Sequence, residues 1–151
     1  MQVGIYKIKT LFTKNISFDG GAPVVGAGDS LTLTGNPVDF TTVTYDFDNE
    51  SDGSIDVDGV TIEYFDLEPI TANISATNVI LNYSATAETI TASDAGGGQT
   101  LIDSDVAGES LTFNNPTSTL TINAGDTGVN TVDIGGLATA YPASILVNGG
   151  D

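Results

Sequence analysis

Short stretches in which apolar and polar residues alternate follow one another along most of the chain, with no helical period between them. They are clearest from Leu111 to Asp151, where Leu-Thr-Phe, Leu-Thr-Ile, Val-Asp-Ile and Ile-Leu-Val are each followed by Asn, Gly or Asp. A period of two is typical of strands with one buried face, and Asn, Gly and Asp are typical of turns. The pattern predicts an all-β protein.

From residue 62 onward the strands form two interleaved series. The first runs through Ile70, Ile90, Leu111 and Val132, with successive offsets of 20, 21 and 21 residues. The second, with offsets near 20 except for a longer last one, runs through Ile62, Ile80 or Leu81, Leu101, Leu120 or Ile122, and Ile145 or Val147. This period predicts a right-handed parallel β-helix, a solenoid with coils of about 20 residues in which each strand lies above its equivalent in the preceding coil. An antiparallel β-sandwich is the alternative, because its strands also recur at intervals of about ten residues.

The first 14 residues differ from the rest, because they contain all three basic residues, Lys7, Lys9 and Lys14. We expect residues 1–14 to form an N-terminal strand or cap and residues 15–151 to form the solenoid domain. The sequence at 15–21 also resembles that at 144–150, at a separation of 129 residues. A true period of this length would make the chain just over one unit of a tandem array. Open edges at both ends would then favour end-to-end self-association or contact with neighbouring repeats.

The strongly acidic charge balance limits the kinds of partner that the chain can bind. The chain has 20 acidic and 3 basic residues, and no Lys or Arg follows Lys14. Binding to nucleic acid is therefore excluded, because phosphate neutralisation needs basic side chains along the contact surface. No apolar run approaches the length of a membrane span, so we expect no membrane insertion. So many carboxylates need salt or divalent cations to relieve their repulsion, and this makes cations the natural partners.

One acidic segment has the spacing of a calcium loop. In residues 48–56 the acids Asp48, Glu50 and Asp52 occupy alternating positions, and a glycine and the apolar Ile55 follow. Calcium loops use oxygens at positions one, three and five, then a glycine for the sharp turn and a hydrophobe that enters the core. A glycine stands where such loops have a bidentate Glu, and the same residues could form a solvated acidic turn. The predicted calcium ligands are Asp46, Asp48, Glu50, Asp52, Asp56 and Asp58.

Catalysis has little support in the sequence. Histidine, cysteine and arginine are absent, so Ser-His and Cys-His arrangements and arginine phosphate clamps are excluded, and we expect no enzyme. Acid pairs such as Asp56 with Asp58, or Asp103 with Asp105, keep a polysaccharide-binding or polysaccharide-cleaving solenoid as the alternative. Its sugar platforms would be Tyr45, Tyr64 and Tyr83. Their positions within strands favour packing at the core instead.

Residues 53–70, which end in Leu-Glu-Pro-Ile, contain a familiar pattern, as do the strand ends at 120–126 and 145–151. Together they resemble adhesin-like β repeats of giant bacterial secreted and surface proteins, which occur alongside cadherin-like and RTX-type calcium-binding repeats. The resemblance implies a non-catalytic, extracellular or cell-surface structural or adhesive module. Such a module would be a stalk, adhesin or filament segment stabilised by calcium. A complete RTX nonapeptide array is missing from the sequence.

Overall fold

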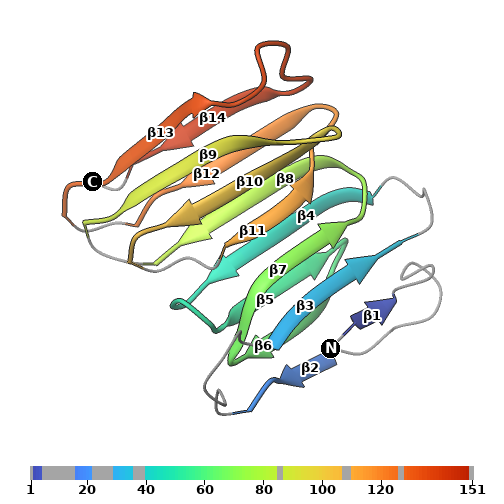
Figure 1. The fold of residues 1–151 in the computed structure, drawn as a ribbon. Helices are drawn as coiled ribbons and strands as arrows, with labels where there is room; N and C mark the ends of the chain where they lie inside the picture. The colour runs from blue at the N-terminus through green and yellow to red at the C-terminus, as the bar shows by residue number, and fades with distance from the viewer. Residues whose placement is uncertain are drawn as a thin grey trace.

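A computed structural model describes residues 2–4, 16–21, 29–35, 40–84, 87–106, 110–125 and 128–149, with only the backbone given for 2–4 and 68. These residues form two seven-stranded sheets that lie face to face (Figure 1). They contain no helix, and therefore none that could span a membrane. The prediction of an all-β protein is confirmed. Lys7, Lys9 and Lys14 lie outside the described residues, so the predicted cap over 1–14 is described only at 2–4.

Alternation of apolar and polar residues gives each strand one inward and one outward face. Sheet A contains, in spatial order, β1 (Gln2–Gly4), β3 (Asp29–Thr34), β7 (Leu67–Asn73), β11 (Leu111–Asn114), β10 (Gln99–Ser104), β9 (Thr89–Gly96) and β13 (Thr131–Gly136). Sheet B contains β14 (Ser144–Asn148), β12 (Thr119–Asn123), β8 (Ala76–Tyr83), β4 (Phe40–Phe47), β5 (Gly53–Val57), β6 (Val60–Phe65) and β2 (Ile16–Asp19). Eight of the twelve strand pairs are parallel and four are antiparallel. Both sheets are therefore mixed, unlike those of a purely parallel stack or a purely antiparallel sandwich.

The chain crosses between the sheets as it advances from one end of the stack to the other. β1, β3, β7, β9 and β13 add to sheet A, and β2, β4, β8, β12 and β14 add to sheet B. At two places the chain turns back on itself. In sheet B, β5 and β6 lie between β4 and β2, and in sheet A, β10 and β11 lie between β9 and β7. These two three-stranded meanders account for all four antiparallel pairs.

The two predicted series of strands separate almost completely between the two sheets. The first series falls on β7, β9, β11 and β13, all in sheet A, and the second falls in sheet B except for Leu101 of β10. The prediction that Ile90 lies directly above Ile70 is wrong, because Leu111 lies opposite Ile70 instead. The cause is that β10 and β11 turn back and occupy the space between β7 and β9.

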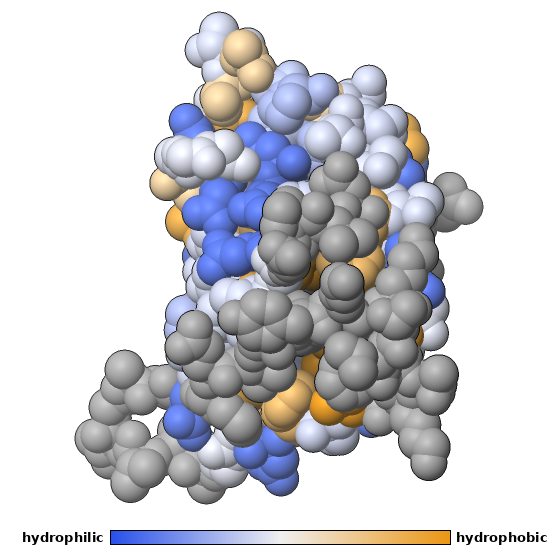
Figure 2. All heavy atoms as spheres, turned by 90° about the vertical axis from the view of Figure 1, so that its right-hand side faces the viewer, coloured by the Kyte–Doolittle hydropathy of each residue, from blue (hydrophilic) through white to orange (hydrophobic). Residues whose placement is uncertain are grey.

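The core is the layer between the sheets, where inward side chains of both sheets meet. The ring of Tyr45 in sheet B lies 6.3 Å from that of Phe113 in sheet A. Within sheet B, Phe47 and Tyr83 stack on neighbouring parallel strands with ring centroids 4.7 Å apart. Outside this layer, Figure 2 shows a side of the molecule where hydrophilic side chains lie among smaller hydrophobic patches.

Candidate functional site

The six predicted calcium ligands lie around β5 but do not converge on one point. Asp48, Glu50 and Asp52 lie in the turn that precedes β5, and Asp58 lies in the turn that follows it. At about 3.3 Å per residue, the four steps from Gly53 to Val57 separate the two turns by about 13 Å. In the part of the chain that the structure describes, no three acidic side chains are arranged to hold a metal ion. The sequence pattern of a compact loop is thus accommodated by a hairpin, because residues 53–57 extend as a strand.

Two of the predicted ligands lie on the outward face of sheet B. Asp46 on β4 accepts hydrogen bonds from the Asn82 amide at 2.6 Å and from the Ser54 hydroxyl at 3.4 Å. Asp56 on β5 accepts a hydrogen bond from the backbone N–H of Gly59 at 2.9 Å. Ile55, which precedes Asp56 on β5, is fully buried. The calcium-loop pattern also predicts a buried hydrophobic residue at this position.

The Asp58 side chain holds the turn that follows β5 in place by accepting hydrogen bonds from backbone N–H groups. Its carboxylate accepts hydrogen bonds from the N–H groups of Thr41 and Thr42, the nearest at 2.9 Å. Its φ of 49° lies in the left-handed region, which Asp adopts more readily than most residues. At this end of β5 the Asp58 carboxylate therefore fastens the β5–β6 turn to the start of β4.

The turn before β5 is built around Asn49 and Asp52. The Asn49 side chain accepts hydrogen bonds from the N–H groups of Ser51 and Asp52, and its amide donates to the Asp52 carboxylate at 2.9 Å. The other Asp52 oxygen accepts from the N–H of Asp66 at 2.9 Å. These bonds, from Asn49 first and Asp66 second, hold the pKa of Asp52 below its usual value. Asp52 therefore stays ionised and fastens the β4–β5 turn to the link between β6 and β7.

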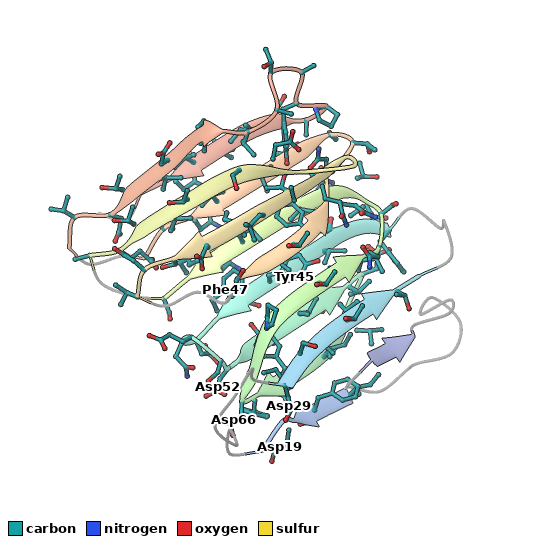
Figure 3. The ribbon with its side chains drawn as sticks, viewed as in Figure 1. Asp19, Asp29, Tyr45, Phe47, Asp52 and Asp66 are labelled. Atoms are coloured by element: carbon teal, nitrogen blue, oxygen red, sulfur yellow. The ribbon has the colours of Figure 1, made fainter. Side chains whose placement is uncertain are left out.

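Further carboxylates reach this end of β5 from other strands. Asp19 of β2 pairs with Phe65, and Asp29 of β3 pairs with Leu67, so both flank Asp66. Figure 3 shows Asp19, Asp29, Asp52 and Asp66 at the lower corner of the molecule. We call these four residues the acidic corner. No Lys, Arg or His occurs in the described ranges to offset their charge.

Only Asp52 of the acidic corner was among the predicted ligands. Asp19, Asp29 and Asp66 belong to segments far apart in the sequence, and parallel pairing of β2 with β6 and of β3 with β7 brings them together. Carboxylate and carbonyl oxygens are the ligands that calcium takes in proteins. A divalent cation at this corner would relieve the repulsion among the four carboxylates.

Glu88 is the buried carboxyl of the described chain, and no sequence motif pointed to it. One of its oxygens accepts a hydrogen bond from the Ser104 hydroxyl at 2.7 Å. Among the described residues, its Oε1 and the hydroxyl of Tyr83 are buried without a hydrogen-bond partner. Burial is the main cause that raises the pKa of Glu88, against the opposing effect of the Ser104 hydrogen bond.

The outer surface of sheet A has an open depression of about 220 Å³ next to this carboxyl. Its lining consists of Thr89, Thr91, Asp103, Ser104 and Asp105. Asp105 accepts a hydrogen bond from the backbone N–H of Thr89 at 2.6 Å. The depression therefore offers hydroxyl and carboxylate groups, including the acid pair Asp103 and Asp105, but no aromatic surface.

The three tyrosines proposed as sugar platforms face the core. Tyr45, Tyr64 and Tyr83 are 1%, 0% and 5% exposed. The alternative prediction that they serve as sugar platforms is therefore wrong, and the prediction that they pack at the core is confirmed. Burial also raises the pKa of the Tyr45 and Tyr83 hydroxyls, which stay protonated.

The sequence matches no protein-family model, no curated protein and no solved structure. The resemblance to adhesin-like β repeats therefore stays a prediction.

Proposed function

We propose that the chain is a non-catalytic structural module of an extracellular or cell-surface stalk, adhesin or filament, and that calcium stabilises it. The observation that carries the proposal is the acidic corner, where four carboxylates from separate segments lie at one corner of the molecule without a basic side chain among the described residues, although no three of them are arranged around a single ion position. Calcium ions are abundant outside cells, and they bind through oxygen ligands of this kind.

The path of the chain supports a structural role. Successive crossings carry the chain from β1 and β2 at one end to β13 and β14 at the other (Figure 1). We interpret this path as a flattened solenoid in which two coils have each been widened by a meander. Such a stack gains length by adding strands, which suits a stalk or filament segment.

Calcium would act on the link between β6 and β7. The Asp52 carboxylate already holds the N–H of Asp66, and the N–H of Gly20 donates to the carbonyl of Phe65 at 2.8 Å. Side chains of the acidic corner would have to turn toward one another to share an ion, and that ion would then join strands β2 and β3 to this link and so fasten the two sheets together. Ion binding to the folded state alone raises stability by mass action.

A thermal melt tests the proposal. At calcium about 100 times above its dissociation constant, the expected gain is about 2.7 kcal/mol, which corresponds to a rise in Tm of about 5–10 °C. Chelator should abolish the rise, and Asp66→Asn should reduce it. Glu63→Gln, an exposed carboxyl in the middle of β6, is the matched control and should keep it. An unchanged Tm with calcium and with chelator would rule out calcium stabilisation.

A polysaccharide-binding or polysaccharide-cleaving module is the second candidate, and the depression lined by Thr89, Thr91 and Asp103 favours it. Hydroxyl and carboxylate groups can bind sugar hydroxyls, although no aromatic ring supports them there. A glycan array with the wild-type chain and Asp103→Asn tests this candidate. Binding that the substitution removes would support it, and an array without hits would rule out this surface as a glycan site.

A further inference from the structure

The two ends of the stack are formed by the edge strands of both sheets. β1 and β2 are the edge strands at one end, and β13 and β14 are those at the other (Figure 1). Among the described residues, no strand pairs with the outer side of any of these four. Unpaired edges present rows of N–H and C=O groups that can accept another strand.

The direction of the edge strands is compatible with head-to-tail continuation of the stack. β2 and β14 point the same way, because two antiparallel steps in sheet B cancel and every other step is parallel. The same holds for β1 and β13 in sheet A. A second copy moved along the stack axis would therefore meet this one with parallel strands in both sheets at once.

The backbone groups at these edges are complementary. The N–H of Ser144 and the C=O of Asn148 bond toward β12, so the backbone groups of Ile145 and Val147 point to the free side. At the other end the N–H of Gly20 bonds toward β6, so those of Ser17 and Asp19 point outward. A copy of β2 placed beside β14 brings free donors and acceptors opposite one another.

The core is only partly covered at the β13 and β14 end, where Leu137 and Tyr141 of the connecting loop pack against it. Val147 lies at an inward position of β14, beside the buried Ile122, but is 42% exposed, because no strand in the described part of the chain covers it. Ile134, at the irregularity of β13, is 39% exposed. Val132 and Ile145, two residues earlier in the same strands, are packed against the core. A second copy would cover these apolar side chains, just as neighbouring strands cover the apolar side chains of the interior strands.

A row of polar side chains crosses the outside of sheet B and stops at this edge. Asn148 donates to Asn123, Asn123 donates to Asn82, and Asn82 donates to Asp46, each at 2.6 Å. The Oδ1 of Asn148 accepts no hydrogen bond from the described residues. The same row ends at Ser17 on the opposite edge, through Ser54 and Glu63. A Ser17 hydroxyl placed beside Asn148 would donate to this free oxygen and continue the row.

The charges on the two edge strands of sheet B allow this contact. β8, β12 and β14 contain no charged residue, although the chain carries a net charge of −17. All three lysines lie at positions 7, 9 and 14, in the sequence between β1 and β2. β14 carries no charge and β2 carries one, Asp19, so contact between these two strands brings few carboxylates together.

We propose that copies of this chain stack head to tail, with β14 of one copy beside β2 of the next and β13 beside β1. The register places Val147 beside Ile16 and Asn148 beside Ser17, as in the rows that already cross sheet B. The proposal rests on the proposed structural function and names its partner as a second copy. Because the two contact surfaces differ, assembly is open-ended and gives filaments, not closed dimers.

Disulfide trapping tests the register. The chain has no cysteine, so Ser17→Cys and Asn148→Cys each carry a single thiol. Neighbouring parallel strands place Cα atoms about 4.8 Å apart, within the disulfide range. Under mild oxidation, a mixture of the two variants should give at least ten times more mixed dimer than Ser17→Cys mixed with Thr44→Cys, whose residue is central in sheet B. Equal yields would overturn the register.

Sedimentation of the full chain tests the assembly itself. The average mass should rise continuously with concentration up to about 1 mM, and more steeply at 150 mM than at 10 mM salt, because screening weakens the charge repulsion. Val147→Asp should weaken association at least tenfold. Val106→Asp, at a residue of similar exposure (45%) away from both ends, should leave it unchanged.

The outcomes separate this inference from the proposed function. A mass that stays at the monomer, or that stops at a dimer, overturns head-to-tail stacking even if calcium still raises Tm. Continuous growth in mass without any calcium effect on Tm supports stacking and counts against calcium stabilisation. Equal association of Val147→Asp and the wild type would place the contact elsewhere and overturn the assignment of the edges.

Discussion

Glu88 is a buried carboxyl that makes the stability of this very acidic protein depend on pH. It is 2% exposed, and its Oε1 has no hydrogen-bond partner among the described residues. Its burial raises its pKa above the unfolded value, so the folded state favours the protonated form. The stability it confers is therefore greatest below the unfolded pKa of about 4.3 and is lost as pH rises through the folded pKa.

Glu88→Gln should remove this loss, because the amide carries no charge and still offers an oxygen to Ser104. We expect the variant to be more stable than the wild type by about 1 kcal/mol at pH 8 and by much less at pH 4. Urea unfolding at both pH values measures the difference. Glu63→Gln, at an exposed carboxyl, is the control. A gain that is equal at the two pH values would contradict the assignment to titration of Glu88.

At the scale of elements, the sheet B meander depends on the missing side chain of Gly53. A Cβ there would collide with the carbonyl oxygen of Asp46 and with the ring and hydroxyl of Tyr64. Gly53 lies between Phe47 on β4 and Tyr64 on β6, in an inward row. The gap at Gly53 leaves room for these two large rings in one layer of the core.

Gly53→Ala should lower the free energy of unfolding by about 2–3 kcal/mol, because β4 and β6 must move to admit the methyl group. Gly59→Ala, in the β5–β6 turn, is the control: a Cβ there meets nothing within 4 Å, and only its φ of +88° opposes the change. That substitution should cost about 1 kcal/mol. Denaturant unfolding of both variants measures the difference. Similar losses for the two would show that the packing at Gly53 is not tight.

At the scale of the whole molecule, the sequence contained the signals for strands and core but not for strand order. Alternation and turn residues were enough for the all-β class, and the 20-residue period separated the strands between two sheets, with Leu101 as the exception. Alternation is the same for parallel and antiparallel neighbours, so nothing local showed that β10 and β11 turn back. That return is why Ile90 does not lie above Ile70.

The candidate site was predictable only in part for a related reason. Spacing suggested that the acids at 46–58 form one loop, but a strand between Asp52 and Asp58 holds them apart. Asp19, Asp29 and Asp66 come to the same corner as Asp52 through pairing between distant segments, which the order of residues in the sequence does not show. Burial of Glu88 likewise depends on how the sheets pack.

The backward turn of the two meanders also affects the order in which the protein can form during synthesis. Every strand after β2 pairs with at least one earlier strand, except β4 and β9, which open the meanders. The longest step along the chain between paired residues runs from Ile16 to Ile62. Loop closure over such moderate lengths costs little additional entropy. A chain that leaves a ribosome or an export channel with its N-terminus first can therefore fold progressively, since each completed strand or meander is the template for the next.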